Sequence, residues 1–302
     1  MDMGTSVLAR LKNKAKETGK PFQLHLQLFC QEEFLRRLAA SQYAQNLVLK
    51  GGLFIYTLTN FESRATVDVD FLLCQLPGAV EDVKRIVDEI IAVDSGNDFI
   101  TFTSRGFETI SPQRKYKGVS FQLVGHIKNT RTPFEVDFGI GDVIVPASQK
   151  RTIPVQLEDF LQPEIMTYSL ESTVAEKLDA LIQRMELTSR MKDIYDIYYI
   201  SKMFDFDGLT LQQAIFETLQ NRGTDYDKDN FDRVIALAED SSIRVRWRQY
   251  LRRMKMPEMN LSEVMTAIDQ FLRPVWNAIL SENKFTQQWS QKDGNWSGNS
   301  WV

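Results

Sequence analysis

Two aspartates in a strand-like run, Asp68 and Asp70, are the first residues whose types and spacing indicate chemistry. Alternate residues of a strand share one face, so both carboxylates point the same way while Val67, Val69 and Phe71 point into the core. Two carboxylates on one face repel each other unless a cation or solvent screens them. Oxygen-only ligands suit Mg²⁺, which usually bridges to substrate phosphates. The pattern therefore favours a magnesium site over two solvated aspartates on an exposed strand.

A second alternating run, residues 134–138, repeats this arrangement further along the chain. It places Glu135 and Asp137 on one face and its apolar residues on the other. If this strand lies beside the first, Asp137 meets Asp68 and Asp70 and completes a site of three carboxylates. Two Mg²⁺ ions held there would activate an attacking hydroxyl and neutralise the leaving pyrophosphate. For this third carboxylate alone, a polar face on an edge strand is the alternative.

A lysine and two glycines, Lys50-Gly51-Gly52, stand between a short apolar run and an expected helix. Glycine lets the backbone approach a phosphate closely, and the first turn of the following helix offers free N–H groups and the positive end of its dipole. The three residues are therefore candidate phosphate ligands, with a tight turn as the plainer alternative. A glycine pair, an Asp-x-Asp strand and a third carboxylate together indicate a nucleotidyltransferase.

Five segments extend this indication to a family. They are Leu47-Val48-Leu49-Lys50-Gly51-Gly52, Arg64-x-Thr66-x-Asp68-x-Asp70, the helix-like run 31–38, Ala175-Glu176-Lys177-Leu178 and Arg190-x-Lys192-Asp193-x-x-Asp196. Together they resemble the AbiEii/AbiGii family of nucleotidyltransferase-like toxins over residues 20–205. Fifteen residues separate Gly52 from Asp68, a longer spacing than in many polymerase-β-type enzymes.

The resemblance implies a nucleotide site with more residues than the two strands supply. It makes Arg64, Thr66 and Lys177 nucleotide ligands beside the glycine pair, with Lys177 on the triphosphate. It makes Asp193 a further catalytic carboxylate and a candidate base for the acceptor hydroxyl. Helical spacing offers plainer alternatives. Lys177 flanks an apolar stripe where lysines also form structural ion pairs, and Arg190 precedes Asp193 by three residues near a helix start.

The resemblance also implies a reaction and partners. The protein would transfer a nucleoside monophosphate from a nucleoside triphosphate to a hydroxyl, first of all at the acceptor end of tRNA. It would act as the toxin of a type IV-like toxin–antitoxin or phage-defence pair, with a DNA-binding autorepressor as its cognate antitoxin. Three alternatives stay open: transfer to a protein side chain or small molecule, a non-catalytic nucleotide-binding module, and a purely structural interaction protein.

One helix-like segment bears on an RNA partner. Arg244, Arg248, Arg252 and Lys255 form one helical stripe, and no acidic residue interrupts residues 243–256. A basic stripe in a protein of net charge −4 is a candidate surface for an RNA backbone, and a solvated helix face is the alternative. The Arg-Lys-Tyr-Lys tract at 114–117 is a second candidate.

The expected elements that would position these residues change in type along the chain. Strand candidates at 47–49, 67–73, 99–103, 119–126 and 134–138 alternate with helices at 22–40, 53–58 and 80–92. After Pro163 the candidates are all helices: 172–187, 190–203, 209–219, 231–238, 243–254 and 261–280. The pattern predicts an α/β (α+β) protein. With the resemblance, it becomes a polymerase-β-like nucleotidyltransferase domain with a small mixed sheet over 1–162, including N-terminal helices, a helical domain closing the cleft over 163–281, and a polar, weakly ordered tail over 282–302.

Composition excludes several other classes of protein. With 43 % hydrophobic and 25 % charged residues, the chain has the balance of a globular protein. No apolar run approaches the roughly 18 residues of a membrane-spanning helix, so no membrane partner is expected. Cys30 and Cys74 are too few for a disulfide framework or a zinc site, and the protein is expected in the cytoplasm. With only two histidines, carboxylates must do the chemistry.

Overall fold

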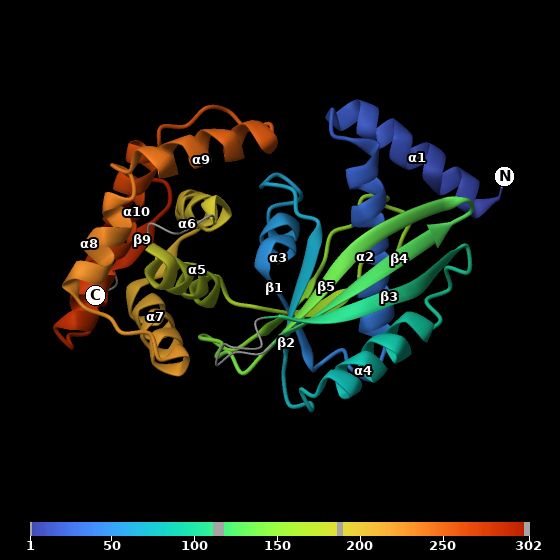
Figure 1. Ribbon diagram of the computed structural model, residues 1–302, viewed down its shortest axis with the longest axis horizontal. Coiled ribbons are helices and arrows are strands. Elements are labelled where there is room, and N and C mark those ends of the chain that lie inside the picture. Colours follow the sequence, from blue (N-terminus) through green and yellow to red (C-terminus); the bar gives the residue numbers. More distant parts are fainter. Residues whose placement is uncertain (1, 111–117, 186–189, 299–302) are drawn as a thin grey trace. The chain divides into compact units, whose positions relative to one another are not determined.

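The computed structural model describes residues 2–110, 118–185 and 190–298. The chain divides into two compact units (Figure 1). The first unit holds Met1–Asp142 and Ser148–Tyr168, and the second holds Val143–Ala147 and Ser169–Val302. Within the described residues, no helix is both long enough and apolar enough to cross a membrane.

The first unit is built on a mixed sheet of seven strands in the order β3-β4-β5-β2-β1-β7-β6. Its central pair, β2 and β5, is parallel, whereas β1 runs antiparallel to β2 and parallel to β7. The strands are β1 (Leu47–Lys50), β2 (Asp68–Leu73), β3 (Ile100–Ile110), β4 (Gly118–Ile127), β5 (Thr130–Ile140), β6 (Gln149–Thr152) and β7 (Glu164–Thr167). The sheet therefore brings together strands that are distant in sequence.

Four helices complete the first unit: α1 (Met3–Thr18), α2 (Phe22–Ala40), α3 (Gly51–Leu58) and α4 (Val80–Ala92). Helix α2 packs against β5 and β7, and the ring of Phe34 lies 6.1 Å from Phe71 and 6.4 Å from Phe134. This helix therefore covers the apolar face of the sheet.

Helix α2 also carries buried charge. Glu33 is fully buried and accepts hydrogen bonds from Arg36 at 3.0 Å and Arg37 at 3.2 Å. Burial raises the pKa of the neighbouring Glu32 to about 7, against the opposing effect of Arg36. Buried charges are tolerated only when they are paired, and these ion pairs let the charged segment 31–38 pack inside the first unit.

The second unit is mainly helical. Its helices are α5 (Leu170–Arg184), α6 (Met191–Met203), α7 (Gly208–Arg222), α8 (Lys228–Ala236), α9 (Ser241–Arg253) and α10 (Leu261–Leu280). Five of them begin at a side chain that accepts a hydrogen bond from the first turn: Ser169, Asp207, Asp227, Asp240 and Asn260. A small sheet in the order β10-β9-β8 joins β8 (Phe206–Asp207), β9 (Gln288–Ser290) and β10 (Asn295–Ser297).

Helices α2, α4 and α10 match the expected elements residue for residue. Strands β6 to β10 were not expected, and the expectation of helices alone after Pro163 was wrong for β7, β8, β9 and β10. The expected end of the helix at 172–187 and the tract at 114–117 lie outside the described residues. The prediction of a weakly ordered tail was wrong for residues 282–298. Trp289 is buried, and its indole Nε1 donates to the carbonyl of Ser201 at 2.7 Å. Burial of large aromatic side chains outweighed a polar composition there.

Candidate active site

The predicted carboxylates lie side by side on one face of the central strands. In the parallel β2–β5 ladder, Asp70 is opposite Asp137 and Asp68 is opposite Glu135. Residues opposite each other in a ladder share a face, so the four carboxylates form two adjacent rows. The alternate residues of both strands are buried against α2: Val69, Phe71, Phe134, Val136 and Phe138.

One residue of the predicted strand behaves differently. Val67, expected in the core, is 48 % exposed because β2 begins only at Asp68. Its carbonyl instead accepts a hydrogen bond of 2.8 Å from the side-chain amide of Gln31 on α2. The chain therefore enters the carboxylate strand through a backbone contact rather than through apolar packing.

The pKa of Asp137 is strongly perturbed. It is raised to about 6, chiefly by burial and also by the charges of Asp70, Asp68 and Glu135, against the lowering effect of a hydrogen bond from Ser120. Its Oδ1 is buried and has no hydrogen-bond partner among the described residues. An unsatisfied oxygen among like charges is an arrangement that a cation would stabilise.

The glycine pair approaches this face directly. Gly51 has a φ of +69°, and a Cβ at this position would overlap the carboxylate of Asp70. A Cβ on Gly52 would lie 2.8 Å from Thr66 Oγ1 and 3.3 Å from the Arg64 guanidinium. Close backbone approach is a reason for glycine, and it brings together the predicted phosphate ligands of the first unit.

Lys50 is held by partners that the sequence analysis did not identify. Its Nζ lies 2.9 Å from Asp142 Oδ2 and 5.3 Å from the centre of the Tyr168 ring. Lys50 is also opposite Asp70 in the β1–β2 ladder. An acidic residue just after β5 was the available sequence signal for Asp142, but spacing alone does not reveal a pair across three strands.

The three predicted metal ligands do not form a ready-made metal site. Among residues 2–110, 118–185 and 190–298, no three His, Cys, Asp or Glu side chains are spaced to hold a metal ion. Asp68 lies two residues, about 7 Å, along the strand from Asp70. The carboxylates nevertheless suit a bound Mg²⁺ ion, because they supply oxygen ligands and repel one another. Asp137 Oδ1 also has no hydrogen-bond partner among the described residues.

A pocket of about 370 Å³ opens beside one pair of these carboxylates, Asp68 and Glu135. Strands β3, β4 and β5, the entry to β2 and helix α2 supply its remaining lining: Gln27, Val67, Arg105, Gln122, Leu123, Pro133 and Phe134. Glu135 and Gln122 are opposite each other in the β4–β5 ladder. The pocket therefore lies on the β4 side of the carboxylates, whereas the glycines lie on the β1 side.

Lys177 and Asp193 meet in the second unit. Lys177 on α5 donates to Asp193 at 3.0 Å and to Asp196 at 2.6 Å, both on α6. Arg190 Nε lies 2.6 Å from the other oxygen of Asp193. The side chains of Lys177 and Asp193 are 10 % and 3 % exposed, so their charges offset each other largely out of solvent. The ion pairs weighed in the sequence analysis are thus present, and they now include Asp196.

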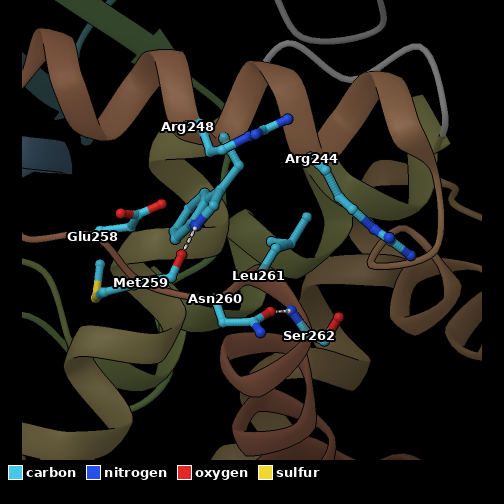
Figure 2. Close-up of a pocket in the computed structure, with 8 residues that line it drawn as sticks. Arg244, Arg248, Glu258, Met259, Asn260, Leu261 and Ser262 are labelled. Atoms are coloured by element: carbon cyan, nitrogen blue, oxygen red, sulfur yellow. Dashed lines mark hydrogen bonds between the residues drawn. The ribbon is translucent and has the colours of Figure 1, made fainter.

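The predicted arginines of α9 lie on its exposed side. Arg244 and Arg248 line a pocket of about 540 Å³ together with the start of α10 (Figure 2). Trp247, which is buried, donates from Nε1 to the carbonyl of Met259 at 2.8 Å and fixes the pocket wall. Arg244 donates to the carbonyls of Ala238 at 2.5 Å and Glu239 at 3.2 Å, so this arginine also stabilises the turn before α9.

Comparison with known proteins identifies a family and similar folds. Residues 33–279 match the model of a family described as nucleotidyl transferase AbiEii toxin, type IV toxin–antitoxin system. The structure is similar to MenT4, a nucleotidyltransferase toxin from Mycobacterium tuberculosis H37Rv, with a TM-score of 0.54 at 17 % identity, over 92 % of this chain and 99 % of that one. JHP933 from Helicobacter pylori gives 0.45 at 12 %, over 83 % and 91 %. No curated protein matches the sequence significantly.

Proposed function

The chain belongs to the AbiEii family of nucleotidyltransferase toxins from type IV toxin–antitoxin systems, and we propose that it transfers a nucleoside monophosphate to the acceptor end of tRNA in a Mg²⁺-dependent reaction. The observation that carries the proposal is the contact between Gly51 and Asp70, with Asp137 beside Asp70. Backbone N–H groups that can donate to a phosphate therefore lie beside carboxylates that can hold a cation. Nucleotidyl transfer from a triphosphate needs both.

The residues of the first unit have distinct tasks in this proposal. Asp68, Asp70 and Asp137 would hold two Mg²⁺ ions, which supply charge neutralisation of the triphosphate and activation of the hydroxyl. The backbone N–H groups that open α3 at Gly51 and Gly52 have no side-chain cap and would donate to phosphate oxygens. Lys50, Arg64 and Thr66 would add charge and a hydroxyl at the same end.

The proposed reaction replaces one bond to the α-phosphorus with another. The acceptor oxygen forms a bond to the α-phosphorus, the bond from that phosphorus to the bridging oxygen breaks, and pyrophosphate leaves. The proton of the hydroxyl passes to a carboxylate. In this scheme Lys177 binds the triphosphate, and Asp193 and Asp196 orient its ammonium group. Asp193 as the base for the acceptor is the second assignment.

The two sides of the carboxylate row suggest where each substrate binds. The glycine pair lies toward β1 and would hold the triphosphate, whereas the pocket toward β4 remains for the acceptor. The side-chain amides of Gln27 and Gln122 and the guanidinium of Arg105 line that pocket and suit the edges and phosphates of a nucleotide. This asymmetry supports an RNA end as the acceptor over a protein side chain or a small molecule, which remain the alternatives together with a non-catalytic nucleotide-binding module.

The proposal includes partners and a location. A cognate antitoxin is implied by the toxin–antitoxin family, and we take it to be a DNA-binding autorepressor. A role in antiviral defence by abortive infection would follow from the same pairing. Nucleoside triphosphates and tRNA place the reaction in the cytoplasm.

Labelled nucleotides test the proposed reaction. Purified protein is incubated with Mg²⁺, total tRNA and each labelled nucleoside triphosphate in turn, with a chelator as the control. We expect label in tRNA with one or more nucleotides, and none with the chelator. No label in tRNA, together with Mg²⁺-dependent nucleotide binding, would refute tRNA as the acceptor; label without Mg²⁺ would refute the metal requirement.

The raised pKa of Asp137 predicts an effect of pH on stability. A carboxyl with a folded-state pKa of about 6, against 3.8 in the unfolded chain, is protonated more readily in the folded protein. Its contribution to stability is therefore complete below pH 3.8 and lost as the pH rises through about 6. At pH 7.5 without Mg²⁺, Asp137→Asn should raise the free energy of unfolding, on the order of 1 kcal/mol after allowance for solvent screening.

Urea denaturation between pH 5 and 7.5 measures this effect. Asp88→Asn, on an exposed carboxylate of α4, serves as the control and should leave the pH dependence intact. A lower free energy of unfolding for Asp137→Asn at pH 7.5 would contradict the assignment of repulsion to this row.

A further inference from the structure

The exposed side of α9 differs from that of α4 in how its cations are paired. Residues 241–257 contain five arginines and one lysine and no acidic residue. The side chains of Arg248, Arg252 and Arg253 make no hydrogen bond or ion pair with any described residue. On α4, by contrast, Lys84 pairs with Asp88 at 3.1 Å and Arg85 with Asp82 at 2.7 Å.

Helix stability does not account for this pattern. Arg244, Arg248 and Arg252 follow each other at four-residue spacing, where like charges destabilise a helix by about 0.2–0.5 kcal/mol per pair. An acidic residue at one of these positions would favour the helix, as Asp82 and Asp88 do on α4. The protein as a whole is acidic, with a net charge of −4. The unpaired arginines are therefore retained at a small cost, which points to an external anion.

The arrangement of the helix defines the surface. Ile243, Trp247, Tyr250 and Leu251 are buried and anchor α9 within the second unit. Helical spacing places Arg248 and Arg252 on one flank of the exposed side and Arg246 and Arg253 on the other. Val245, which is 43 % exposed, lies between the flanks with the exposed Gln249. The arginines therefore lie on both sides of a neutral strip formed by Val245 and Gln249, and their charge is spread along the helix.

We propose that this exposed arginine surface of α9 binds the sugar–phosphate backbone of the RNA acceptor. The proposal rests on the proposed function for the identity of the RNA. Guanidinium groups bind phosphates in bidentate geometry and are less strongly hydrated than ammonium groups, which fits the predominance of arginine over lysine here. Contacts of this kind read no sequence and raise the affinity for any RNA of suitable shape.

A charge-reversed variant tests the surface. Arg248→Glu combined with Arg252→Glu changes two exposed side chains without partners among the described residues, so the fold should persist. Lys84→Glu combined with Arg85→Glu makes the same change of formal charge on α4 and serves as the control. RNA binding is measured with labelled total tRNA at several salt concentrations, and triphosphate binding and thermal stability are measured in parallel.

We expect the α9 variant to bind RNA at least about tenfold more weakly at low salt, with a reduced salt dependence, because phosphate contacts release counterions. Its affinity for nucleoside triphosphate and its melting temperature should match the wild type, and the α4 control should bind RNA normally. If RNA binding were weakened equally in both variants, the effect would come from the overall charge of the protein, and the proposal would be overturned. An α9 variant that binds RNA normally but loses its antitoxin would also overturn it and would assign the surface to a protein.

The same measurements separate this inference from the proposed function. Wild-type protein that binds RNA through α9 but transfers no nucleotide to it would refute tRNA transfer and leave the surface standing. Wild-type protein that labels tRNA, with an unchanged Michaelis constant for RNA in the α9 variant, would leave the reaction standing and refute the surface.

Discussion

Asp70→Asn is expected to lower the rate of nucleotidyl transfer by about three orders of magnitude or more. A metal-held transition state is stabilised by several kcal/mol, and about 4 kcal/mol corresponds to a factor of about 10³. Asp70 is the carboxylate on which the site converges, because it is opposite both Asp137 and Lys50 and adjoins Gly51. Asparagine keeps the shape of the side chain but removes its charge.

The variant should fold normally, since removing one of several neighbouring negative charges relieves repulsion. The charge of Asp70 is one of the causes that raise the pKa of Asp137, so that pKa should fall in the variant. Transfer is measured as kcat at saturating triphosphate and RNA, with Asp88→Asn on α4 as the matched control. Activity within tenfold of the wild type would exclude Asp70 as a metal ligand.

Lys177→Met is expected to lower the free energy of unfolding by about 3–5 kcal/mol, the cost of leaving a buried charge without its partner. Lys177 hydrogen-bonds to both Asp193 and Asp196, and both aspartates are almost fully buried. Methionine preserves the apolar stem of lysine and removes the ammonium group. Two carboxylates would then face each other without it.

Two further variants complete this test by urea denaturation. Lys192→Met, at an exposed position of α6, should change stability by less than about 0.5 kcal/mol. Adding Asp196→Asn to Lys177→Met should restore part of the loss, because it removes one of the two carboxylates that Lys177 neutralises. A loss below about 1 kcal/mol for Lys177→Met would show that the cluster is not structural, and would favour a role for Lys177 in binding triphosphate alone.

The sequence predicted best what depends on periodicity. Strict alternation in β2 and β5 gave the shared face of Asp70 and Asp137, because a strand with one buried face admits a single register. The glycine pair predicted a close approach, and the structure supplies the partner, Asp70. The family match and the mixed sheet confirm the expected family and fold class.

Partners across distant segments could not be predicted in the same way. Spacing indicated that Lys177 flanks an apolar stripe, but not that two aspartates of the next helix enclose it. The pairing of Lys50 with Asp142 joins β1 to the end of β5, and no local pattern encodes it. Trp289 lies in a polar segment whose composition predicts little order, and its burial depends on a surface that other helices create. The roles of these residues in the reaction remain predictions.

The parallel pairing of β2 with β5 has a consequence for the order of folding. Helix α4 and strands β3 and β4 lie between these two neighbours in the chain, so their ladder closes a long loop and must overcome its entropy. Local hairpins such as β4–β5 form without that cost. A nascent or partly folded chain therefore lacks the juxtaposed carboxylates until this long loop has closed.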